Sequence, residues 1–463
     1  MIVEEMEMLE GQKCLIIGSG ISGIGAAKLL SNYPVDITLY DSNEKLTPES
    51  IAEKLPEGVK VRCITGELPK DVENETQALI LSPGVPTDIE LVNRLRDRSV
   101  KILGEIELAY LAEKGQVAAI TGTNGKTTTT TLVGDIVKNW IGEDKTFVVG
   151  NIGNPYTLEV LGSSEASVTV AEISSFQLET IHTFKPKVSA ILNITPDHLN
   201  RHHTMEGYVA AKEAVAMNQT KQEICVLNYE NEYTRDFGKR CPARVVFFSS
   251  VRELEEGYFL RGTRIIRKFD GAEQDLMDIR EDMNLVGIHN AENVMAAIAI
   301  AEGMGAPMET ILSTIKVFKA VEHRIEYVAT KKGVVYYNDS KGTNPDAAIQ
   351  GIKAMDRPTI LIGGGYDKQN TYDEWIESFD GKVKWLVLIG QTREKIAECA
   401  RKHGITQIKF ADTYQECLEL CTALAEPGDA VLLSPACASW GMFPNYETRG
   451  KLFKEYVNGL PQE

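Results

Sequence analysis

Short apolar runs alternate with stretches of helical periodicity along most of the chain. The run KCLIIG is followed by a helical stretch over residues 24–30 and then by a second apolar run, VDITLYD. A strand, a helix and another strand in this order predict a βαβ unit with parallel strands. The same order returns in the centre, from QVAAITG to EICVLN, and again from VVYYNDS to AVLLSPACAS. The pattern therefore predicts an α/β protein.

Three consecutive α/β domains are the organisation that we expect, over residues 1–104, 105–320 and 321–463. The first and last should be Rossmann-like, and the central one should contain a mainly parallel sheet. In the central part the alternating run YFLRGTRIIRKF has Gly-Thr in its middle, which predicts a small antiparallel hairpin. A chain of 463 residues is long enough for about three domains of ordinary size.

The composition narrows the function classes. The chain carries 66 acidic and 49 basic residues, a net charge of −17, which argues against binding through nucleic-acid phosphates or an anionic membrane. The N-terminus has no basic and apolar leader, and no apolar run reaches the ~18 residues of a membrane span. The eight cysteines contain no CxxC pair, so we expect buried free thiols. A cytoplasmic protein is the expectation.

A glycine-rich turn follows the first predicted strand. Gly18, Gly20 and Gly23 form a GxGxxG pattern before a helix, and Asp41 ends the next strand. Such a turn lets a pyrophosphate approach the backbone and a helix N-terminus, while the acid accepts from a ribose hydroxyl. This pattern alone indicates an NAD-dependent oxidoreductase, although a UDP-sugar would fit the same turn, and a tight turn without a ligand remains an alternative.

A second glycine turn, TGTNGKTT over residues 121–128, lies between a predicted strand and a helix. Its backbone can surround phosphates, Lys126 can neutralise them, and Thr127 can offer a hydroxyl to Mg²⁺. It is shorter than the usual P-loop motif, because Ile120 stands where that motif has its first glycine. We expect a P-loop-type ATPase domain here, and an ATPase acting on a macromolecular partner is one alternative.

Further chemistry follows the ends of later predicted strands. Glu172 and His198 come after two strands that we expect to be adjacent, and with Thr127 they could share divalent cations. In the last third, Arg324, Lys341 and Lys368 are cations at strand-to-loop junctions of an acidic chain. Their placement favours the recognition of an anionic ligand.

Taken together, these motifs resemble the Mur ligases. The matching segments run in the family's order over essentially the whole chain: SPG at 82–84, GTNGKT at 122–127, GNIG at 150–153, EISSFQLE at 172–179, NITPDH at 193–198, HNAEN at 289–293, HR at 323–324, NDSKGTNPDA at 338–347 and LSPACAS at 433–439. The resemblance implies ATP-dependent addition of D-glutamate to UDP-N-acetylmuramoyl-L-alanine through an acyl phosphate, in peptidoglycan precursor synthesis. The superfamily also contains folylpolyglutamate synthases, which are the nearest alternative.

The resemblance also implies roles for individual residues. The metal ligands would be Thr127, Glu172, His198 and a carbamylated Lys212, holding two Mg²⁺ ions, with Lys126 as a further catalytic residue. By itself the sequence around Lys212 predicts only a solvated helix lysine. The ATP ligands would be Gly122, Thr123, Asn124, Gly125, Lys126, Thr127, Thr128, Asn290, Asn293, Arg324 and Asp339.

The two other substrates have their own implied ligands. Those of the UDP-linked substrate would be Gly20, Ile21, Ser22, Gly23, Asp41, Ser42, Ser82, Gly84, Asn151 and His198. Those of D-glutamate would be Lys341, Thr343, Lys368, Ser439 and Tyr446. The resemblance further implies a UDP-binding first domain, an ATP-binding central domain, an amino-acid-binding last domain, and a monomer.

Overall fold

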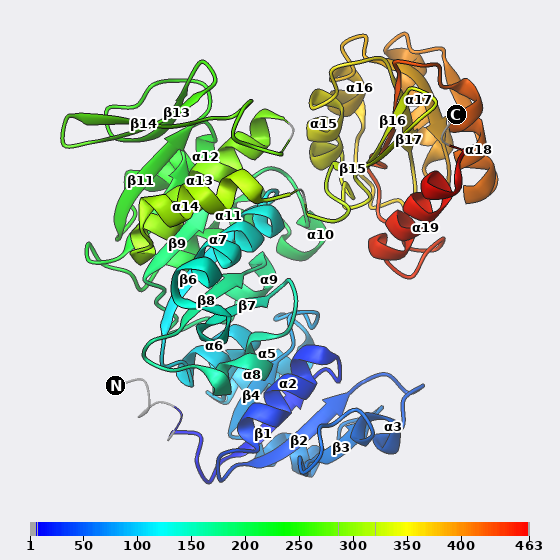
Figure 1. The fold of residues 1–463 in the computed structure, drawn as a ribbon. Coiled ribbons are helices and arrows are strands. Elements are labelled where there is room, and N and C mark those ends of the chain that lie inside the picture. The colour runs from blue at the N-terminus through cyan, green and yellow to red at the C-terminus, as the bar shows by residue number, and fades with distance from the viewer. Residues whose placement is uncertain (1–5, 7, 286, 320, 462–463) are drawn as a thin grey trace. The chain divides into compact units, whose positions relative to one another are not determined.

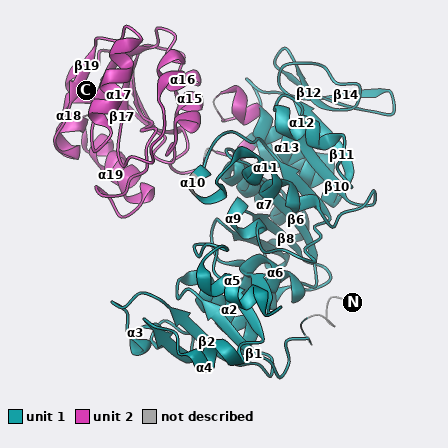
Figure 2. Ribbon diagram, turned by 180° about the vertical axis from the view of Figure 1, so that it is seen from behind, with its two compact units in different colours: residues 1–282, 292–316 teal, residues 283–291, 317–463 magenta. Residues whose placement is uncertain are grey.

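The computed structural model describes residues 6, 8–285, 287–319 and 321–461, and they form three sheets (Figure 1). These residues divide into two compact units (Figure 2). Unit 1 consists of residues 1–282 and 292–316 and contains two of the sheets, whereas unit 2 consists of residues 283–291 and 317–463 and contains the third. The α/β class with three consecutive sheets is as predicted, while the exact boundaries at 104 and 320 stay a prediction.

The first sheet of unit 1 is parallel and has the order β3-β2-β1-β4-β5. Its strands are β1 (Lys13–Ile17), β2 (Asp36–Asp41), β3 (Arg62–Thr65), β4 (Ala78–Leu81) and β5 (Lys101–Gly104). The helices between them are α2 (Ile21–Leu30), α3 (Pro48–Ala52), α4 (Lys70–Glu75) and α5 (Glu90–Asp97). The predicted βαβ unit is β1-α2-β2. The sequence did not reveal β3 and β5, which are four-residue edge strands.

The second sheet of unit 1 has nine strands in the order β14-β13-β12-β11-β10-β9-β6-β8-β7. They are β6 (Gln116–Thr121), β7 (Thr146–Gly150), β8 (Val168–Glu172), β9 (Val188–Ile191), β10 (Ile224–Asn228), β11 (Arg244–Ser249), β12 (Gly257–Arg261), β13 (Arg264–Phe269) and β14 (Ala272–Asp278). The predicted hairpin is β12-β13, and β14 extends it as a third antiparallel strand (Figure 1). The expectation that β8 and β9 are adjacent is wrong, because β6 lies between them.

The helices of unit 1 connect and cover these sheets. They are α6 (Glu105–Leu111), α7 (Lys126–Ile141), α8 (Tyr156–Glu159), α9 (Ser175–Leu178), α10 (Leu199–His202), α11 (Met205–Glu213), α12 (Glu232–Gly238), α13 (Ile288–Met304) and α14 (Met308–Val317). The first turn of α13 and the last residue of α14 belong to unit 2.

Helix α6 fixes the first sheet of unit 1 to the second. One apolar core extends from Ile16 and Leu39 of the first sheet, through Ile106 of α6, to Val117 and Ala119 of the second. The buried carboxylate of Glu107 accepts hydrogen bonds from the backbone N–H groups of residues 182–184, and thereby satisfies donors that the core would otherwise leave unpaired. The two sheets of unit 1 therefore share one hydrophobic interior.

Unit 2 is built on a six-stranded sheet of order β15-β16-β20-β17-β18-β19, in which only β15 is antiparallel to its neighbour. The strands are β15 (Glu326–Lys331), β16 (Val334–Asn338), β17 (Thr359–Gly363), β18 (Val383–Leu388), β19 (Ile408–Phe410) and β20 (Ala430–Leu433). The helices are α15 (Pro345–Lys353), α16 (Asp373–Glu377), α17 (Arg393–Lys402), α18 (Tyr414–Leu424) and α19 (Tyr446–Gly459). A separate apolar cluster covers each face of this sheet.

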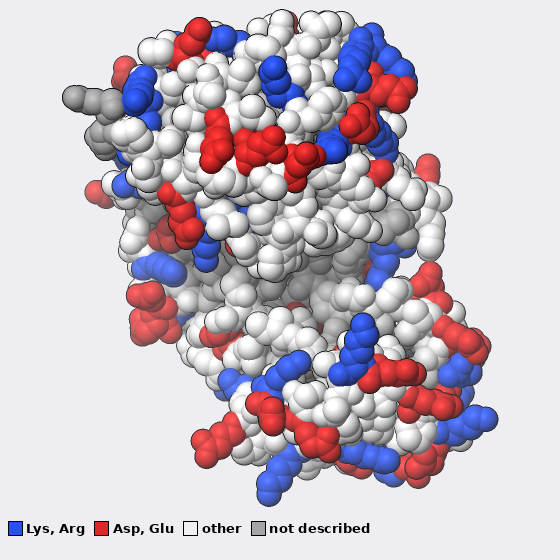
Figure 3. All heavy atoms as spheres, turned by 90° about the vertical axis from the view of Figure 1, so that its right-hand side faces the viewer, with Lys and Arg blue, Asp and Glu red and all other residues white. Residues whose placement is uncertain are grey.

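The surface charges and the cysteines can be compared with what the composition predicts. Figure 3 shows acidic and basic side chains intermixed on the face that it presents. Within the described residues no helix is long and apolar enough to cross a membrane. All eight cysteines are free thiols, seven of them buried and Cys63 half-buried.

Candidate active site

The phosphate loop joins β6 to α7 in the middle of the nine-stranded sheet. Gly122 and Gly125 have positive φ angles of 151° and 86°, which glycine adopts without strain. A Cβ at Gly125 would also overlap Oδ1 of Asn293, so α13 packs directly on the loop. Asn193, which follows β9, accepts a hydrogen bond from the backbone N of Asn124 (2.8 Å) and donates one to its carbonyl (3.1 Å). The loop is therefore held by its neighbours from both sides.

Two lysines converge on this loop. Lys126 Nζ donates to the carbonyl oxygens of Gly122 (2.8 Å) and Thr123 (2.9 Å), and Lys212 Nζ donates to the carbonyl oxygen of Gly122 (2.8 Å). Lys212 is only 1% exposed and its Nζ lies 4.7 Å from the ring centre of Tyr208. Burial, reinforced by the charge of Lys126, holds the pKa of Lys212 well below its ordinary value. The solvated helix lysine predicted from the sequence alone is therefore wrong.

Glu172, at the end of β8, is a buried carboxylate with one satisfied oxygen. It is 1% exposed, and its Oε1 accepts a hydrogen bond from Nδ2 of Asn151 (2.8 Å). Its buried Oε2 has no hydrogen-bond partner among the described residues. Such an oxygen is costly to bury unless a cation or a donor reaches it. A divalent cation that prefers oxygen ligands, such as Mg²⁺, therefore fits this side chain.

His198 lies beyond the end of β9, on the other side of β6 from Glu172. Its φ is 54°, and its backbone N donates to Oδ1 of Asp197 (2.8 Å). Its ring packs edge-on against Phe176 at 4.9 Å between centroids, and its side chain is 40% exposed. The imidazole is therefore fixed in position while part of it stays accessible. The segment before His198 is tied to the phosphate loop, because Thr123 Oγ1 donates to the carbonyl oxygen of Thr195 (3.2 Å). Glu172 pairs with Ile120 of β6 just before the loop.

Three residues of this neighbourhood had no role in the sequence analysis: Asn193, Asp197 and Tyr208. Asn193 fixes the loop, Asp197 orients His198, and the hydroxyl of Tyr208 lies 3.1 Å from Oγ1 of Thr123. Asn193 and Asp197 lie inside the NITPDH segment, so their position near His198 was the available signal. Tyr208 precedes Lys212 by one helical turn, a spacing that places both side chains on one face of α11.

The glycine turn of the first sheet is closed by side chains. A Cβ at Gly23 would overlap the carbonyl oxygen of Gly18, so α2 begins directly against the turn. Asp41 accepts from the backbone N (2.9 Å) and the hydroxyl (2.6 Å) of Ser19, and Ser82 Oγ donates to Gly18 O (3.2 Å). Desolvation raises the pKa of Asp41. The two hydrogen bonds from Ser19 and one from the backbone N of Asn43 outweigh this effect, so the pKa of Asp41 lies below its ordinary value.

The remaining residues predicted for the UDP-linked substrate surround this turn. Gly20 is the N-cap of α2, and the side chain of Ile21 is 63% exposed. Ser42 and Gly84, which follow β2 and β4, are exposed, while Ser22 is half-buried. The carboxyl ends of β1, β2 and β4 therefore form one edge at which these residues gather.

The residues predicted to contact ATP divide between the two units. In unit 2, Asp339 is fully buried at the end of β16 and accepts from Ser434 Oγ (2.7 Å) and the backbone N of Ile325 (3.3 Å). Burial raises its pKa to about 6, although Arg324 at 3.9 Å opposes this. Asn290 is buried and lies three residues before Asn293, on the same face of α13.

The residues predicted for D-glutamate all lie in unit 2. Lys341 Nζ lies 5.4 Å from the ring centre of Tyr446, and Lys368 Nζ lies 5.4 Å from that of Trp440. Ser439 is 4% exposed and, with Gly364 and Arg449, lines a small pocket. Thr343 is half-buried in the loop before α15.

Arg449 is a buried cation that the sequence analysis did not single out. It donates to the hydroxyl (2.9 Å) and the carbonyl (2.7 Å) of Ser340 and to the carbonyl of Cys437 (3.2 Å). Burial lowers its pKa to about 10, and it stays charged at neutral pH. Arg449 therefore holds the loop after β16, which carries Lys341, against the loop after β20, which carries Ser439.

Comparison with known proteins agrees with this geometry. Three family models match in succession: a Mur ligase MurD-like N-terminal domain over residues 12–104, a Mur ligase middle domain over 120–301 and a Mur ligase glutamate ligase domain over 323–437. The chain is 55% identical over 453 residues to the UDP-N-acetylmuramoylalanine–D-glutamate ligase of Lachnoclostridium phytofermentans, covering 98% of this chain and 99% of that protein. The chain belongs to the Mur ligase family.

Other Mur ligases support the same assignment. The proteins of the same printed name from Lachnospira eligens and Clostridioides difficile are 54% and 44% identical to this Mur ligase, each over 98% of its chain and at least 99% of their own. Among solved structures, MurF from Acinetobacter baumannii superposes with a TM-score of 0.61 at 16% identity, covering 98% of each chain. MurC from Thermotoga maritima gives a TM-score of 0.58 at 17% identity, covering 96% of this chain and 99% of that one. At these identities the structures show the fold alone.

Family membership decides between the interpretations of the first glycine turn. A Mur ligase is an ATP-dependent ligase, so the GxGxxG turn does not mark an NAD-dependent oxidoreductase. The phosphate loop likewise belongs to a ligase rather than to an ATPase that acts on a macromolecule.

Proposed function

We propose that the protein joins D-glutamate to UDP-N-acetylmuramoyl-L-alanine with the conversion of ATP to ADP and phosphate, a step of peptidoglycan precursor synthesis. The relatives that match along the whole chain carry this activity in their names. The observation in the structure that supports it best is the unpartnered Oε2 of buried Glu172, in the neighbourhood of a phosphate loop that two lysines contact. A folylpolyglutamate synthase is not favoured, because the N-terminal family model is MurD-like.

The chemistry begins with a poor electrophile. The alanine carboxylate must attack the γ-phosphorus of ATP, which breaks the bond to the β-phosphate oxygen and leaves ADP. The amine of D-glutamate then attacks the resulting acyl phosphate, loses a proton, and expels phosphate as the amide forms. Both steps bring anions together, so fixed cations and preorganised N–H donors have to offset the developing charge.

The phosphate loop provides these groups in this protein. Lys126 would leave the carbonyl oxygens of Gly122 and Thr123 to meet the terminal phosphates, and the backbone N–H groups at the start of α7, residues 125–128, would donate to them. Glu172 and His198, with Thr127, would hold Mg²⁺, which supplies positive charge to the phosphate oxygens when bound. A second Mg²⁺ at His198 and a modified Lys212 is part of the proposal.

Lys212 has the environment that carbamylation needs. Burial holds the pKa of Lys212 well below its ordinary value and so favours the neutral, nucleophilic form of the amine, whose nitrogen can attack carbon dioxide and release one proton, which leaves a carbamate anion. The anion would replace the hydrogen bond to Gly122 and could accept a cation. The carbamate is thus consistent with the buried position of Lys212.

Roles in substrate binding follow the same division of the chain. For the UDP-linked substrate we propose Gly20, Ile21, Ser22, Gly23, Asp41, Ser42, Ser82, Gly84, Asn151 and His198. For ATP we propose the phosphate loop with Asn290, Asn293, Arg324 and Asp339, and for D-glutamate Lys341, Thr343, Lys368, Ser439 and Tyr446. A monomeric state and a cytoplasmic location stay predictions.

The experiment that tests the function is a phosphate-release assay over a matrix of substrates. Phosphate should appear only when ATP, Mg²⁺, UDP-N-acetylmuramoyl-L-alanine and D-glutamate are all present. Equal turnover with L-glutamate, or ATP hydrolysis without the muramoyl substrate, would contradict the proposal. A titration of the protein with NADH and with UDP adds a check on the first glycine turn, which should bind only UDP.

A further inference from the structure

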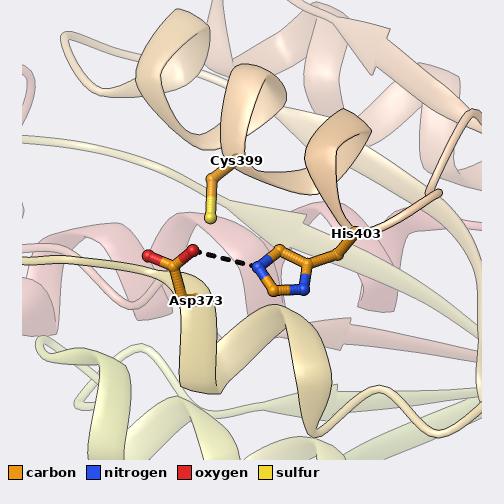
Figure 4. A group of neighbouring side chains, drawn as sticks. All are labelled: Asp373, Cys399 and His403. Carbon is orange, nitrogen blue, oxygen red and sulfur yellow. Dashed lines mark hydrogen bonds and ion pairs between the residues drawn. The ribbon is translucent and has the colours of Figure 1, made fainter.

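A carboxylate, a thiol and an imidazole meet between α16 and α17 of unit 2 (Figure 4). Asp373 is the first residue of α16, whereas Cys399 and His403 lie one turn apart on α17 and at its C-cap. The ligand atoms of the three side chains all lie within 4.8 Å of one another, and His403 Nε2 is 2.9 Å from Asp373 Oδ1. Spacing of four residues puts the thiol and the imidazole on one helix face.

A second group of possible ligands in unit 2 provides a contrast. Glu322, His323 and Glu326 also lie close together, but Lys454 Nζ stands 2.9 Å from one of the two carboxylates and 2.5 Å from the other. An ammonium group therefore already neutralises that cluster. At Asp373 the ion pair that the structure shows is with His403, whose ring can itself become a metal ligand.

We propose that Asp373, Cys399 and His403 bind one divalent transition-metal ion of the zinc class. Thiolate, imidazole and carboxylate are the donors that Zn²⁺ takes in tetrahedral sites. Its bond lengths require about 3.3 Å between the nitrogen and oxygen ligands and about 3.5 Å between nitrogen and sulfur. The observed 2.9 Å between His403 and Asp373 is about 0.4 Å short of this, so a small side-chain movement opens the site.

A carboxylate beyond the three ligands completes the arrangement. Glu377, one turn along α16 from Asp373, has Oε1 at 3.7 Å from Nδ1 of His403. Imidazoles that bind metal through one nitrogen usually donate the other N–H to such an acceptor, which fixes the ring. With Nε2 on the ion and Nδ1–H towards Glu377, the fourth position is left to water, because Asp373 and Glu377 are 61% and 64% exposed.

Metal binding at this site releases a proton. Burial, and then Asp373, raises the pKa of the Cys399 thiol to about 11, so the thiol is protonated at neutral pH without metal. When the sulfur–metal bond forms, the S–H bond breaks and its proton goes to solvent, with no change in oxidation state.

The site adjoins the segment that carries Lys368. Asp367 accepts from Lys395 of α17 at 3.3 Å, and the backbone N of Gly365 donates to Oγ1 of Thr392 at 3.1 Å. The hydrogen bonds of Gly365 and Asp367 already hold the start of the segment 365–373 against α17. An ion bound by Asp373 and α17 would hold the end of the same segment against that helix. It would stabilise unit 2 against unfolding.

Cobalt(II) is the direct probe, because thiolate ligation gives a charge-transfer absorption band that oxygen and nitrogen ligands do not. The full-length protein is titrated with Co²⁺ in excess Mg²⁺, and one thiolate band per chain is expected. Cys399→Ser and His403→Gln should abolish it, while the matched control Cys63→Ser keeps it. A missing band in the parent protein, or one that persists in Cys399→Ser, would overturn the proposal.

Zinc itself is then measured by competition with a chromophoric chelator and by thermal unfolding. Zn²⁺ should bind one per chain, raise the unfolding temperature of the parent protein and of Cys63→Ser, and bind at least tenfold more weakly to Asp373→Asn. Because Asp373 is exposed, this variant should fold normally, which circular dichroism checks. Equal zinc affinity in the parent protein and Asp373→Asn would remove the carboxylate from the site.

Discussion

The two glycine turns of unit 1 follow one backbone plan but carry different charges. Each joins a central parallel strand to a helix, and each has a glycine whose Cβ would overlap a neighbouring oxygen, Gly23 and Gly125. At the first turn the charged neighbour is Asp41, which bonds to Ser19 of the turn itself. At the second, Lys126 and Lys212 bond to the loop. The shared backbone conformation supplies N–H donors for phosphate groups at both turns, and the charged side chains beside each turn determine which chemistry it supports.

The difference in charged side chains matches the role that we propose for each turn. A turn that only holds a diphosphate can rely on backbone donors and a helix N-terminus. A turn at which a phosphoryl group moves also needs mobile cations and metal ligands, because negative charge is redistributed during transfer. The comparison predicts that charge changes at the second turn affect the rate, whereas backbone changes at the first affect substrate binding.

The largest expected effect is that of Lys126→Ala. Removing this cation should lower kcat by at least about a thousandfold, because no other group of the loop replaces its charge at the terminal phosphates. Steady-state kinetics measure the effect, and thermal unfolding should show an unchanged fold. Lys138→Ala, in the last turn of the same helix, is the control and should keep nearly normal activity. Near-normal turnover in Lys126→Ala would refute the assignment.

Lys212→Ala tests the buried lysine that contacts the loop. The variant should be almost inactive, and short-chain carboxylic acids should restore part of its activity if the parent side chain acts as a carbamate. Activity is measured over a range of added acetate or propionate. The same acids should not restore Lys126→Ala, since that lysine acts as a cation. If Lys212→Ala gains nothing from the acids, the carbamate is not supported.

Glu172→Gln keeps the shape of the side chain and removes its charge. We expect a fall in kcat of about a hundredfold and a higher Mg²⁺ requirement. The free energy of unfolding should not fall, because a neutral amide is easier to bury than a carboxylate with an unpartnered oxygen. Kinetics over Mg²⁺ concentration and denaturant unfolding measure both. Glu143→Gln, at an exposed position, is the control, and an equal effect there would contradict the metal assignment.

Substitutions at two glycines of the first turn distinguish an effect on ligand binding from an effect on folding. Gly20→Ala adds a methyl group with no chain atom within 4 Å, so it should raise the KM of the UDP-linked substrate by about tenfold and leave stability and kcat unchanged. Gly23→Ala pushes against Gly18 and should lower the unfolding temperature as well. If Gly20→Ala leaves KM unchanged, a diphosphate does not approach the turn there.

Asp41→Asn should have the smallest effect. The pKa of Asp41 is lower in the folded chain than in the unfolded one, so its stabilisation is present above the ordinary value of 3.8 and disappears as the pH falls through the folded value. Since the group is partly exposed, we expect less than about 1 kcal/mol. The unfolding temperatures of parent and variant should differ at pH 7, and the difference should shrink as the pH falls below 3.8. A constant difference would show that charge is not involved.

The apolar pattern predicted the central strands of the three sheets, because these strands are almost fully buried. It missed the edge strands β3, β5, β15 and β19, which have few buried positions. It also could not give the strand order, and this is why Glu172 and His198 were expected on adjacent strands. Order depends on contacts between distant segments, which local periodicity does not encode.

For the site, glycine spacing and strand ends were sufficient to locate the phosphate loop. Burial of single polar residues was not visible: Lys212 lies in an ordinary amphipathic helix pattern, and Arg449 lies at a helical position with no motif around it. The absence of a CxxC pair predicts that Cys399 is a buried free thiol, although a histidine four residues later is an equally valid spacing for a metal. Asp373, more than twenty residues away, could be placed beside them only by the fold.

The shared interior beneath the two sheets of unit 1 limits how such a protein can be recombined. A gene fragment that stops at Gly104 would keep α2 on this face but would omit Ile106, Leu108 and Tyr110 of α6, and so would expose the part of the apolar core that α6 covers. Its product would aggregate rather than behave as a portable nucleotide-binding module. Exchange between relatives should therefore preserve α6 together with both sheets, so that this part of the molecule is inherited as one piece.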